Sequence, residues 1–201
     1  GDFIVNGIFA GTGEIRLTGI GSTIGGTGTI TNTNNLVVEG NKTIPASAQF
    51  AKIAGDLQIN GAYTITNHGS VNISGNIDGG QIVLIALWVN AANSTLTVGG
   101  NIGMNVELDA SATGNTVAYA GSIIVQLVPR PVGGQYANLS LSGTSYKLLP
   151  SDPISLSGNY VNDCAFVLYP SGHITFNGTT TISGTYDATF PEVMIKGTLI
   201  A

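Results

Sequence analysis

The sequence predicts an all-β protein, and three observations lead to this class. Apolar and polar residues alternate in short runs along the whole chain, as they do in half-buried strands. The breaks between runs are rich in turn-forming residues, and glycine alone accounts for 29 of the 201 residues. No segment keeps apolar residues at helical spacing for more than one turn. We therefore expect roughly sixteen short strands at about ten-residue spacing, arranged as an antiparallel β-sandwich or, alternatively, as a β-solenoid.

Strands can be placed along the chain wherever the alternation is clear. In the first half they cover residues 14–20, 36–39, 50–54, 57–59, 63–66, 71–75, 82–89 and 96–98. In the second half they cover residues 106–108, 117–128, 139–141, 154–156, 160–169, 174–176 and 193–200. Asn60–Gly61 and Asn177–Gly178 each separate two such runs. Because both residues of an Asn-Gly pair accept positive φ, we expect a β-hairpin at each pair.

The longest apolar run extends from Ile82 to Val89. It is too short to cross a membrane as a helix, so no membrane span is expected, and it suits a central strand buried on both faces. The single tryptophan, Trp88, lies within this run. We expect Trp88 to pack in the core, which disfavours a carbohydrate-binding module because such a module needs exposed aromatic side chains.

Two fragments of the sequence resemble each other. Residues 71–77 read Val-Asn-Ile-Ser-Gly-Asn-Ile, and residues 96–102, which begin 25 positions later, read Leu-Thr-Val-Gly-Gly-Asn-Ile. A strict repeat is the signature of a solenoid. The pattern fades outside residues 57–108, and no period continues through the second half. Shared Gly-Asn turn chemistry explains the likeness more simply, so the sandwich is the preferred architecture.

The composition favours an exported surface protein. Charged residues make up only 8% of the chain, whose net charge is −5, whereas ordinary domains contain about a quarter charged residues. Thr, Ser and Asn supply the polarity instead. With six Lys and Arg residues the chain has no basic stripe, so nucleic acid is not an expected partner. Because the sequence begins at Gly1, we interpret it as a mature chain secreted after removal of a signal peptide.

No residue pattern predicts catalysis, a metal site or a cofactor. Cys164 is the only cysteine, and its apolar neighbours indicate a buried side chain rather than a reactive thiol. Glu107 and Asp109 share one face of a strand, as residues on a solvated face do. His68 and His173 lie beside separate turns, with no second His or Cys near either one in the sequence. No serine has a Gly-x-Ser-x-Gly frame, so an enzyme is not expected.

Five Asn-x-Ser/Thr sequons make N-linked glycans a candidate modification. The sequons begin at Asn41, Asn72, Asn93, Asn138 and Asn177. The composition alone would give nearly as many, so their number proves little. Asn177 lies at a predicted hairpin tip and Asn93 in a loop-like segment, and these two are the preferred sites.

The first ten residues are unusual for the end of a chain, because they are apolar on both faces. The odd face carries Phe3, Val5 and Phe9, and the even face carries Ile4, Ile8 and Ala10. A first strand normally has one face in water. The segment therefore belongs in the middle of a fold, either that of its own domain or that of a neighbouring molecule.

Both ends of the chain resemble pilins. The C-terminal segment 172–190, with Gly-Thr-Tyr at 184–186, followed by the strand at 193–200, looks like the closing hairpin of pilin-type β-sandwiches. The N-terminal segment 3–7, followed by an alternating strand, is similar to the donor-strand extension of type I-like pilins. Bacterial chaperone–usher pilins usually carry a Cys pair, from which this chain departs. A low-charge, sequon-bearing chain without a disulfide resembles the archaeal thread pilins.

The resemblance implies donor-strand complementation. Residues 1–20 would form an N-terminal extension, and residues 21–201 would form an Ig-like β-sandwich body that lacks one strand. The extension of one subunit would fill the groove of the next through Phe3, Ile4, Val5, Gly7, Ile8 and Phe9. This β-augmentation would make the protein a homopolymer, the structural subunit of an adhesive extracellular filament on the cell surface. The alternative is a non-filamentous surface or adhesin domain whose N-terminal strand pairs within its own fold.

Overall fold

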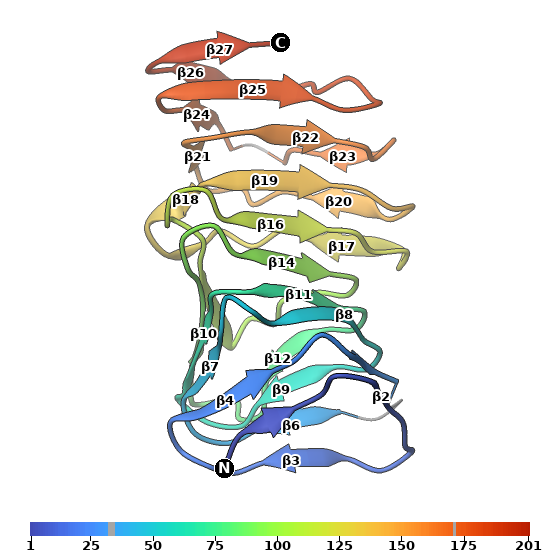
Figure 1. Cartoon of the computed structure of the whole chain (residues 1–201). Helices are drawn as coiled ribbons and strands as arrows, with labels where there is room; N and C mark the ends of the chain where they lie inside the picture. The colour runs from blue at the N-terminus through green and yellow to red at the C-terminus, as the bar shows by residue number, and fades with distance from the viewer. Residues whose placement is uncertain (32–34, 171) are drawn as a thin grey trace.

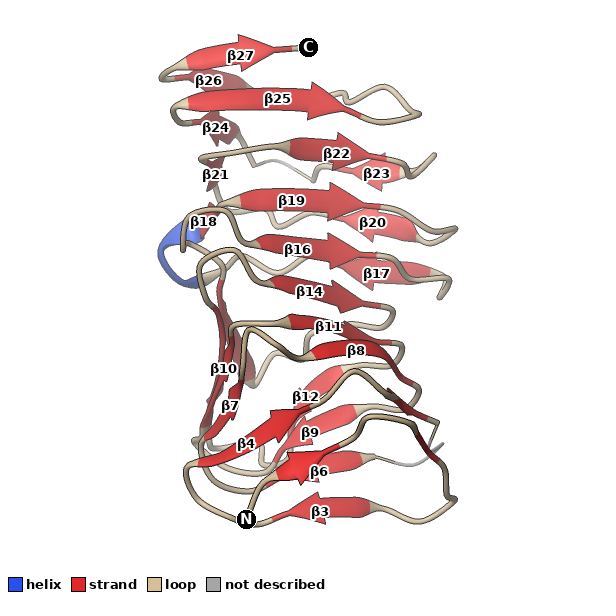
Figure 2. Ribbon diagram, in the orientation of Figure 1, coloured by secondary structure: helices blue, strands red, loops and turns tan. Residues whose placement is uncertain are grey.

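Every strand pair in the described part of the chain is parallel, and the strands stack in register as a β-solenoid (Figure 1). The computed structural model describes residues 1–31, 35–170 and 172–201. The chain winds around three faces, and Figure 2 shows the strands of successive turns stacked from the N-terminal end to the C-terminal end.

The first face consists of a six-stranded and a four-stranded sheet, joined by a bridge between Ala110 and Tyr136. The six strands are β1 (Phe3–Ile4), β4 (Ser22–Gly25), β7 (Lys42–Ile44), β10 (Thr64–Asn67), β13 (Ala86–Asn90) and β15 (Val106–Asp109). The four strands are β18 (Gln135–Tyr136), β21 (Ile154–Leu156), β24 (Ile174–Phe176) and β26 (Val193–Ile195).

The second face is a ten-stranded sheet that runs the whole length of the stack. Its first five strands are β2 (Ile8–Phe9), β5 (Thr29–Ile30), β8 (Gln49–Ile53), β11 (Ser70–Ile73) and β14 (Thr95–Val98). Its last five strands are β16 (Thr116–Tyr119), β19 (Asn138–Leu141), β22 (Tyr160–Asn162), β25 (Thr179–Ser183) and β27 (Thr198–Ile200).

The third face has a four-stranded and a three-stranded sheet. The four strands are β3 (Ile15–Leu17), β6 (Leu36–Val38), β9 (Leu57–Ile59) and β12 (Ile77–Gly79), and a bridge from Ile77 to Ile102 extends them by one turn. The three strands are β17 (Val125–Leu127), β20 (Tyr146–Leu148) and β23 (Val167–Leu168). A short 3₁₀ helix, η1 (Val132–Gly134), lies between β17 and β18.

The all-β prediction is confirmed, but the preferred antiparallel sandwich is not supported, and the alternative, the solenoid, describes the fold. Consecutive strands turn a corner into different sheets instead of folding back on each other. After Asn60–Gly61 the chain passes from β9 on the third face to β10 on the first, and after Asn177–Gly178 it passes from β24 to β25. Gly61 and Gly178 have the expected positive φ, at 146° and 76°. The turns were therefore placed correctly, whereas the two predicted hairpins are wrong.

The two similar fragments of the sequence are a structural repeat, contrary to the simpler explanation. Val71 pairs with Leu96 and Ile77 with Ile102, so residues 71–77 and 96–102 hold equivalent positions on adjacent turns. The period is irregular: paired residues lie as few as 19 positions apart, as for Ile174 and Val193, or as many as 26, as for Ala110 and Tyr136. A search for one fixed spacing misses such a repeat.

Inward side chains of the three faces fill the interior. On the first face Trp88 lies in register between Ile65 and Leu108, and all three side chains are buried. The predicted core position of Trp88 is confirmed, as is the burial of Cys164. The long buried strand predicted at 82–89 is only half correct. β13 begins at Ala86, and residues 82–85 lie in the corner before it, where Ile82 is 96% exposed.

Aromatic rings fill the interior of the last turns. The ring of Phe190 contacts the rings of Tyr160, Tyr169 and Phe176 edge-on, with centroids 5.1–5.7 Å apart. The hydroxyl groups of Tyr160 and Tyr169 lie 2.7 Å apart and share a hydrogen bond. Burial raises the pKa of Tyr160 to about 12, so this pair is neutral at physiological pH.

A ladder of buried asparagines runs along the corner between the first and second faces. The Nδ2 of Asn67 donates to the Oδ1 of Asn90 at 2.8 Å, and the Nδ2 of Asn90 faces the Oδ1 of Asn115 at 3.4 Å. Asn67 and Asn90 also donate to the backbone carbonyls of Thr95 and Thr116. Each amide thus links neighbouring turns and satisfies backbone groups that the corner takes out of the sheets.

A second side-chain ladder follows the corner between the second and third faces. The backbone N–H of Asn76 donates to Asp56 Oδ1 at 2.7 Å, and that of Asn101 donates to Asn76 Oδ1 at 2.8 Å. The N–H of Leu127 continues the series to Asn101 Oδ1 at 2.7 Å. In each step a side-chain oxygen accepts the N–H of a residue one turn later. Hydrogen bonds of this kind, added to the sheets, tie the turns together along the axis.

Candidate functional site

The segment expected to act as a donor strand lies in the first turn of the solenoid. β1 pairs with β4 and β2 pairs with β5, so the N-terminal strand pairs within its own fold, as the alternative interpretation expected. Val5 is buried; its N–H donates to Gly25 O at 2.9 Å, and its carbonyl accepts the N–H of Gly28 at 2.8 Å. The chain passes so closely here that a Cβ on Gly28 would lie 2.1 Å from the carbonyl oxygen of Gly7.

The other donor-strand residues divide between the interior and the surface. Phe3 is half-buried and its ring contacts the ring of Phe9 edge-on, with centroids 5.7 Å apart. Ile4, Ile8 and Phe9 are exposed by 53%, 79% and 41%. The first turn therefore carries exposed apolar side chains on strands that have a partner on one edge only in the described part of the chain.

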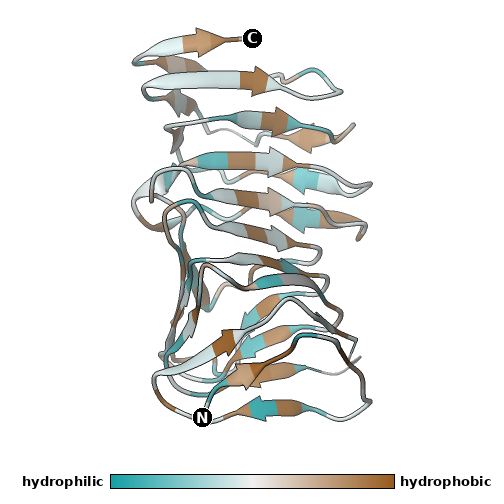
Figure 3. Cartoon of the chain, in the orientation of Figure 1, coloured by the Kyte–Doolittle hydropathy of each residue, from teal (hydrophilic) through white to brown (hydrophobic). Residues whose placement is uncertain are grey.

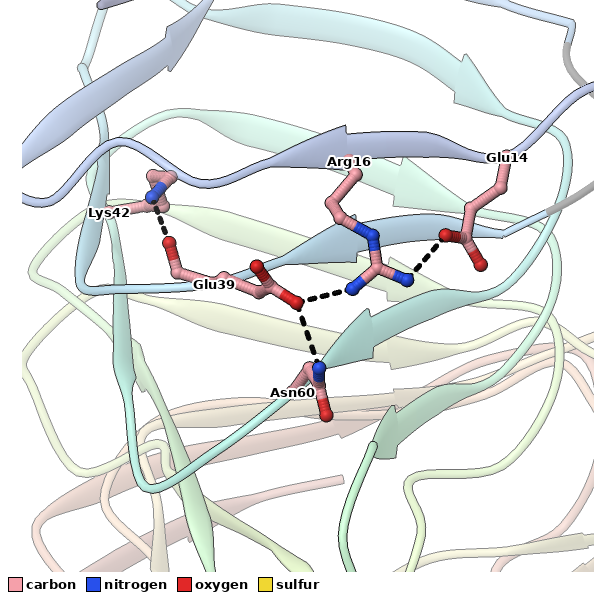
Figure 4. Close-up of polar contacts among 5 residues, drawn as sticks. All are labelled: Glu14, Arg16, Glu39, Lys42 and Asn60. Carbon is pink, nitrogen blue, oxygen red and sulfur yellow. Dashed lines mark hydrogen bonds and ion pairs between the residues drawn. The ribbon is translucent and has the colours of Figure 1, made fainter.

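A charged network links three turns of the third face (Figure 4). Arg16 makes an ion pair with Glu14 at 2.6 Å and a second ion pair with Glu39. The Nδ2 of Asn60 donates to the same Glu39 oxygen at 2.9 Å. The bonds from Asn60 and then from Arg16 lower the pKa of Glu39, and the bonds to Glu14 and Glu39 raise the pKa of Arg16. Solvent surrounds these groups, so the network orients side chains and adds little stability.

Lys42 closes the adjoining corner from inside (Figure 4). Its side chain is buried, and its Nζ donates to the carbonyl oxygens of Gly19, of Glu39 at 2.8 Å and of Gly40 at 3.4 Å. Burial lowers the pKa of Lys42. Three carbonyl acceptors satisfy the three protons of an ammonium group, so Lys42 serves to hold the corner together.

The five sequon asparagines differ in accessibility. Asn41 and Asn93 are exposed, and Asn93 has a positive φ of 59°. Asn72 and Asn177 are half-buried. Asn138 donates its Nδ2 to Asn115 O at 2.7 Å and accepts from a backbone N–H through its Oδ1, also at 2.7 Å. A glycan on Asn138 would replace a structural hydrogen bond, so Asn41 and Asn93 are the best placed of the five.

The other residues considered for chemistry are dispersed. Glu107 is exposed and Asp109 half-buried on β15, and His68 and His173 lie on different turns. Among the described residues, no group of three His, Cys, Asp or Glu side chains is placed to hold a metal ion. The same residues contain no helix long and apolar enough to cross a membrane.

No protein-family model, curated protein or solved structure matches the chain. Its function must be inferred from its own geometry.

The sheet of β17, β20 and β23 carries the feature that sequence reasoning missed. Its polar residues Gln126 and Lys147 point inward and are fully buried. The Nζ of Lys147 donates to Gln126 Oε1 at 2.6 Å, and the same oxygen accepts the N–H of Gly121 at 2.9 Å. Val-Gln-Leu at 125–127 and Tyr-Lys-Leu at 146–148 alternate in the sequence, and the colours of Figure 3 show hydrophobic and hydrophilic residues alternating along the strands. Residues 125–127 fall within the strand expected at 117–128, whereas no strand was expected at 146–148, and the alternation alone does not show which side of a strand faces the interior.

Lys147 should make the stability of the protein depend on pH in the alkaline range. Burial lowers the pKa of Lys147 to about 8, whereas an unfolded lysine titrates near about 10.4. Between these two pKa values Lys147 is protonated in the unfolded chain but neutral in the folded chain. The free energy of unfolding of the wild type therefore rises with pH in this range. Below about pH 8 the buried charge is present in full and opposes folding.

We therefore expect Lys147→Met to melt at a higher temperature than the wild type at pH 7, and this difference in melting temperature to be clearly smaller at pH 9.5, where folded wild type has lost the Lys147 proton. Thermal melts followed by circular dichroism at both pH values measure the difference. A difference in melting temperature that is constant between pH 7 and pH 9.5 would show that Lys147 does not titrate in the folded state as inferred.

Proposed function

We propose that the chain is a non-catalytic structural module of a cell-surface or extracellular assembly, in which the stacked turns act as a rigid spacer. The continuous axial bonding carries this proposal. Backbone ladders join each turn to the next on the second face from β2 to β27, and the asparagine ladder and the Asp56–Leu127 series reinforce two corners. Such a stack derives its stability from contacts between neighbouring turns, so its length follows from the number of turns.

The outer surface of the second face suits an extracellular setting. Its outward rows carry small uncharged polar side chains, such as the row Ser70, Thr95, Thr116 and Asn138, whose members are paired in register. These residues hydrate the surface without charge and suit strands because threonine is β-branched. The scarcity of charge, at 8% of the chain, agrees with this.

Removing one complete turn tests the spacer function. Deletion of residues 70–94 removes β11, β12 and β13. Thr95 then takes the position of Ser70, its register partner, and β10 takes the place of β13 as the neighbour of β15. The shortened chain should fold cooperatively and be shorter by about 4.8 Å in solution scattering. Deletion of residues 70–81, about half a turn, is the control and should prevent folding. If both deletions unfold the protein, its turns are not interchangeable spacer units.

A head-to-tail filament is the second candidate, and the two terminal turns favour it. In the described part of the chain, β1 and β2 at one end and β26 and β27 at the other have a partner on one edge only. Apolar side chains are exposed at both ends, including Ile8 at 79% and Ile195 at 53%. The last turn of one copy would then pair with the first turn of the next by β-augmentation, and the N-terminal strand would extend a neighbour's sheets instead of filling a groove.

A proline at position 195 tests end-to-end pairing. Lys196 donates its N–H to Phe176 O at 2.8 Å, and alternate residues of a parallel strand donate to the same neighbour. The N–H of Ile195 therefore points to the open edge, and Ile195→Pro removes an outward donor without breaking a bond to β24. Filaments seen by electron microscopy for the wild type and for Ile195→Ala should be absent for Ile195→Pro. Filaments that survive the proline exclude pairing through β26.

A further inference from the structure

The outer surface of β17, β20 and β23 is apolar in both of its rows. Strand register aligns Val125 with Tyr146 in the first row, which Phe166 continues just before β23, and it aligns Leu127, Leu148 and Leu168 in the second row. The rings of Tyr146 and Phe166 are stacked with centroids 4.7 Å apart and an interplanar angle of 30°. Phe166, Leu168 and Leu127 are exposed by 52%, 49% and 44%. We call these six residues the third-face patch.

The side chains beneath the patch show that its orientation is not a by-product of core packing. Gln126 and Lys147 occupy the interior at full burial, so these strands are reversed with respect to the usual apolar-in, polar-out pattern. Burying a lysine is unfavourable unless its charge is satisfied. The fold accepts this burial and keeps the six patch side chains on the outer side of the sheet, where five are exposed and Leu148 is half-buried. A contiguous apolar surface of this kind marks an interaction site.

The apolar surface continues beyond the patch along the same side of the stack. Leu127 lines a hollow together with Ile82, Ile85 and Met104. The exposed fractions of Ile82, Ile85 and Met104 are 96%, 55% and 103%. These exposed neighbours, beside which Asp78 lies, enlarge the apolar surface that a partner could cover.

A second groove borders the patch at the corner next to η1. It is lined by Leu127, Leu148, Arg130 and Glu107, among others. Arg130 and Glu107 carry opposite charges, so the lining of this groove has no net charge, whereas the whole chain has a net charge of −5. The patch itself contains no charged side chain. It is therefore a surface through which two copies can approach without strong repulsion between like charges.

We propose that the third-face patch is the interface of a two-fold dimer of this chain. A flat sheet face packs best on another flat sheet face, about 10 Å away, and a second copy supplies one of the same width and chemistry. A two-fold axis brings the same patch of both copies together and closes the assembly at two. This lateral pairing uses no residue of β26 or β27, so it is independent of head-to-tail growth.

Sedimentation equilibrium of the full chain with single substitutions tests the dimer. The wild type should dimerise with a Kd on the order of micromolar. Phe166→Ser removes one of the two stacked rings of the patch and should raise the Kd at least about 30-fold, as loss of an interface hot spot does. Ile20→Ser is the matched control, because Ile20 is 85% exposed away from the patch, and it should leave the Kd unchanged.

Hydrogen exchange of the wild type provides a readout that does not depend on a variant. Backbone amides at 125–127, 146–148 and 166–168 should exchange more slowly as the protein concentration rises, while those at 95–98 on the second face stay constant. A chain that is monomeric at all concentrations, or a dimer that Phe166→Ser leaves intact, overturns the proposal. A monomer that instead binds neutral phosphatidylcholine vesicles through the patch also overturns it, in favour of a lipid surface. Ile195→Pro should leave the dimer unaffected even where it abolishes filaments.

Discussion

Replacing Trp88 with alanine is expected to lower the free energy of unfolding by about 3–5 kcal/mol. Trp88 is fully buried in the middle of β13, with Ile65 on one neighbouring turn and Leu108 on the other. The hydrogen-bonded turns on both sides hold the strand in place, so the interior cannot collapse around the missing indole. Urea unfolding followed by circular dichroism measures the loss.

Trp88→Phe is the matched control. The indole Nε1 of Trp88 is buried and has no hydrogen-bond partner among the described residues. Phenylalanine removes this unsatisfied donor and keeps most of the apolar contact, so we expect a loss below about 1.5 kcal/mol. If alanine is tolerated as well as phenylalanine, the turns around Trp88 are not packed as rigidly as the structure indicates.

Replacing Asn90 with leucine should cost about 2–4 kcal/mol, although the two side chains have similar size. Asn90 stands in the middle of the buried ladder, where it accepts from Asn67 and donates to Asn115 and to Thr116 O. Leucine leaves polar groups of both neighbours buried with fewer partners. Thermal and urea unfolding measure the effect.

Asn72→Leu is the control for this prediction, because Asn72 lies half-buried on the outward side of β11. It should change the free energy of unfolding by no more than about 0.5 kcal/mol. The double variant Asn67→Leu, Asn90→Leu should lose less than the sum of the two single losses, because both side chains belong to one network. Additive losses would show that the asparagines act independently and do not form a ladder.

Local features of the fold could be predicted from the sequence because they depend on neighbouring residues. Alternation gave the all-β class, and the positive φ at Gly61 and Gly178 follows from turn chemistry. The turn residues in the sequence do not distinguish a hairpin from a solenoid corner, because both structures need a glycine where the chain changes direction. The choice depends on which distant strand forms the pair, and the variable turn length concealed the repeat that would have decided it.

The candidate surfaces were harder to predict, because they invert the usual rules. Residues 82–85 form an apolar run that is exposed at a corner, and Lys147 is a charged residue that is fully buried. Each contradicts the expectation that apolar side chains lie inside. The apolar N-terminal strand, in contrast, drew attention correctly to a segment that needs a partner. It finds that partner in β4 and β5 of its own chain.

Immunogold electron microscopy of intact cells that make this protein tests the proposed function most directly. An antibody raised against the folded chain should label the outside of intact cells, with the gold particles displaced outward from the envelope. The density of label should not increase when the cells are permeabilised. Label that appears only after permeabilisation would contradict the proposal that the solenoid is a structural module of a surface or extracellular assembly.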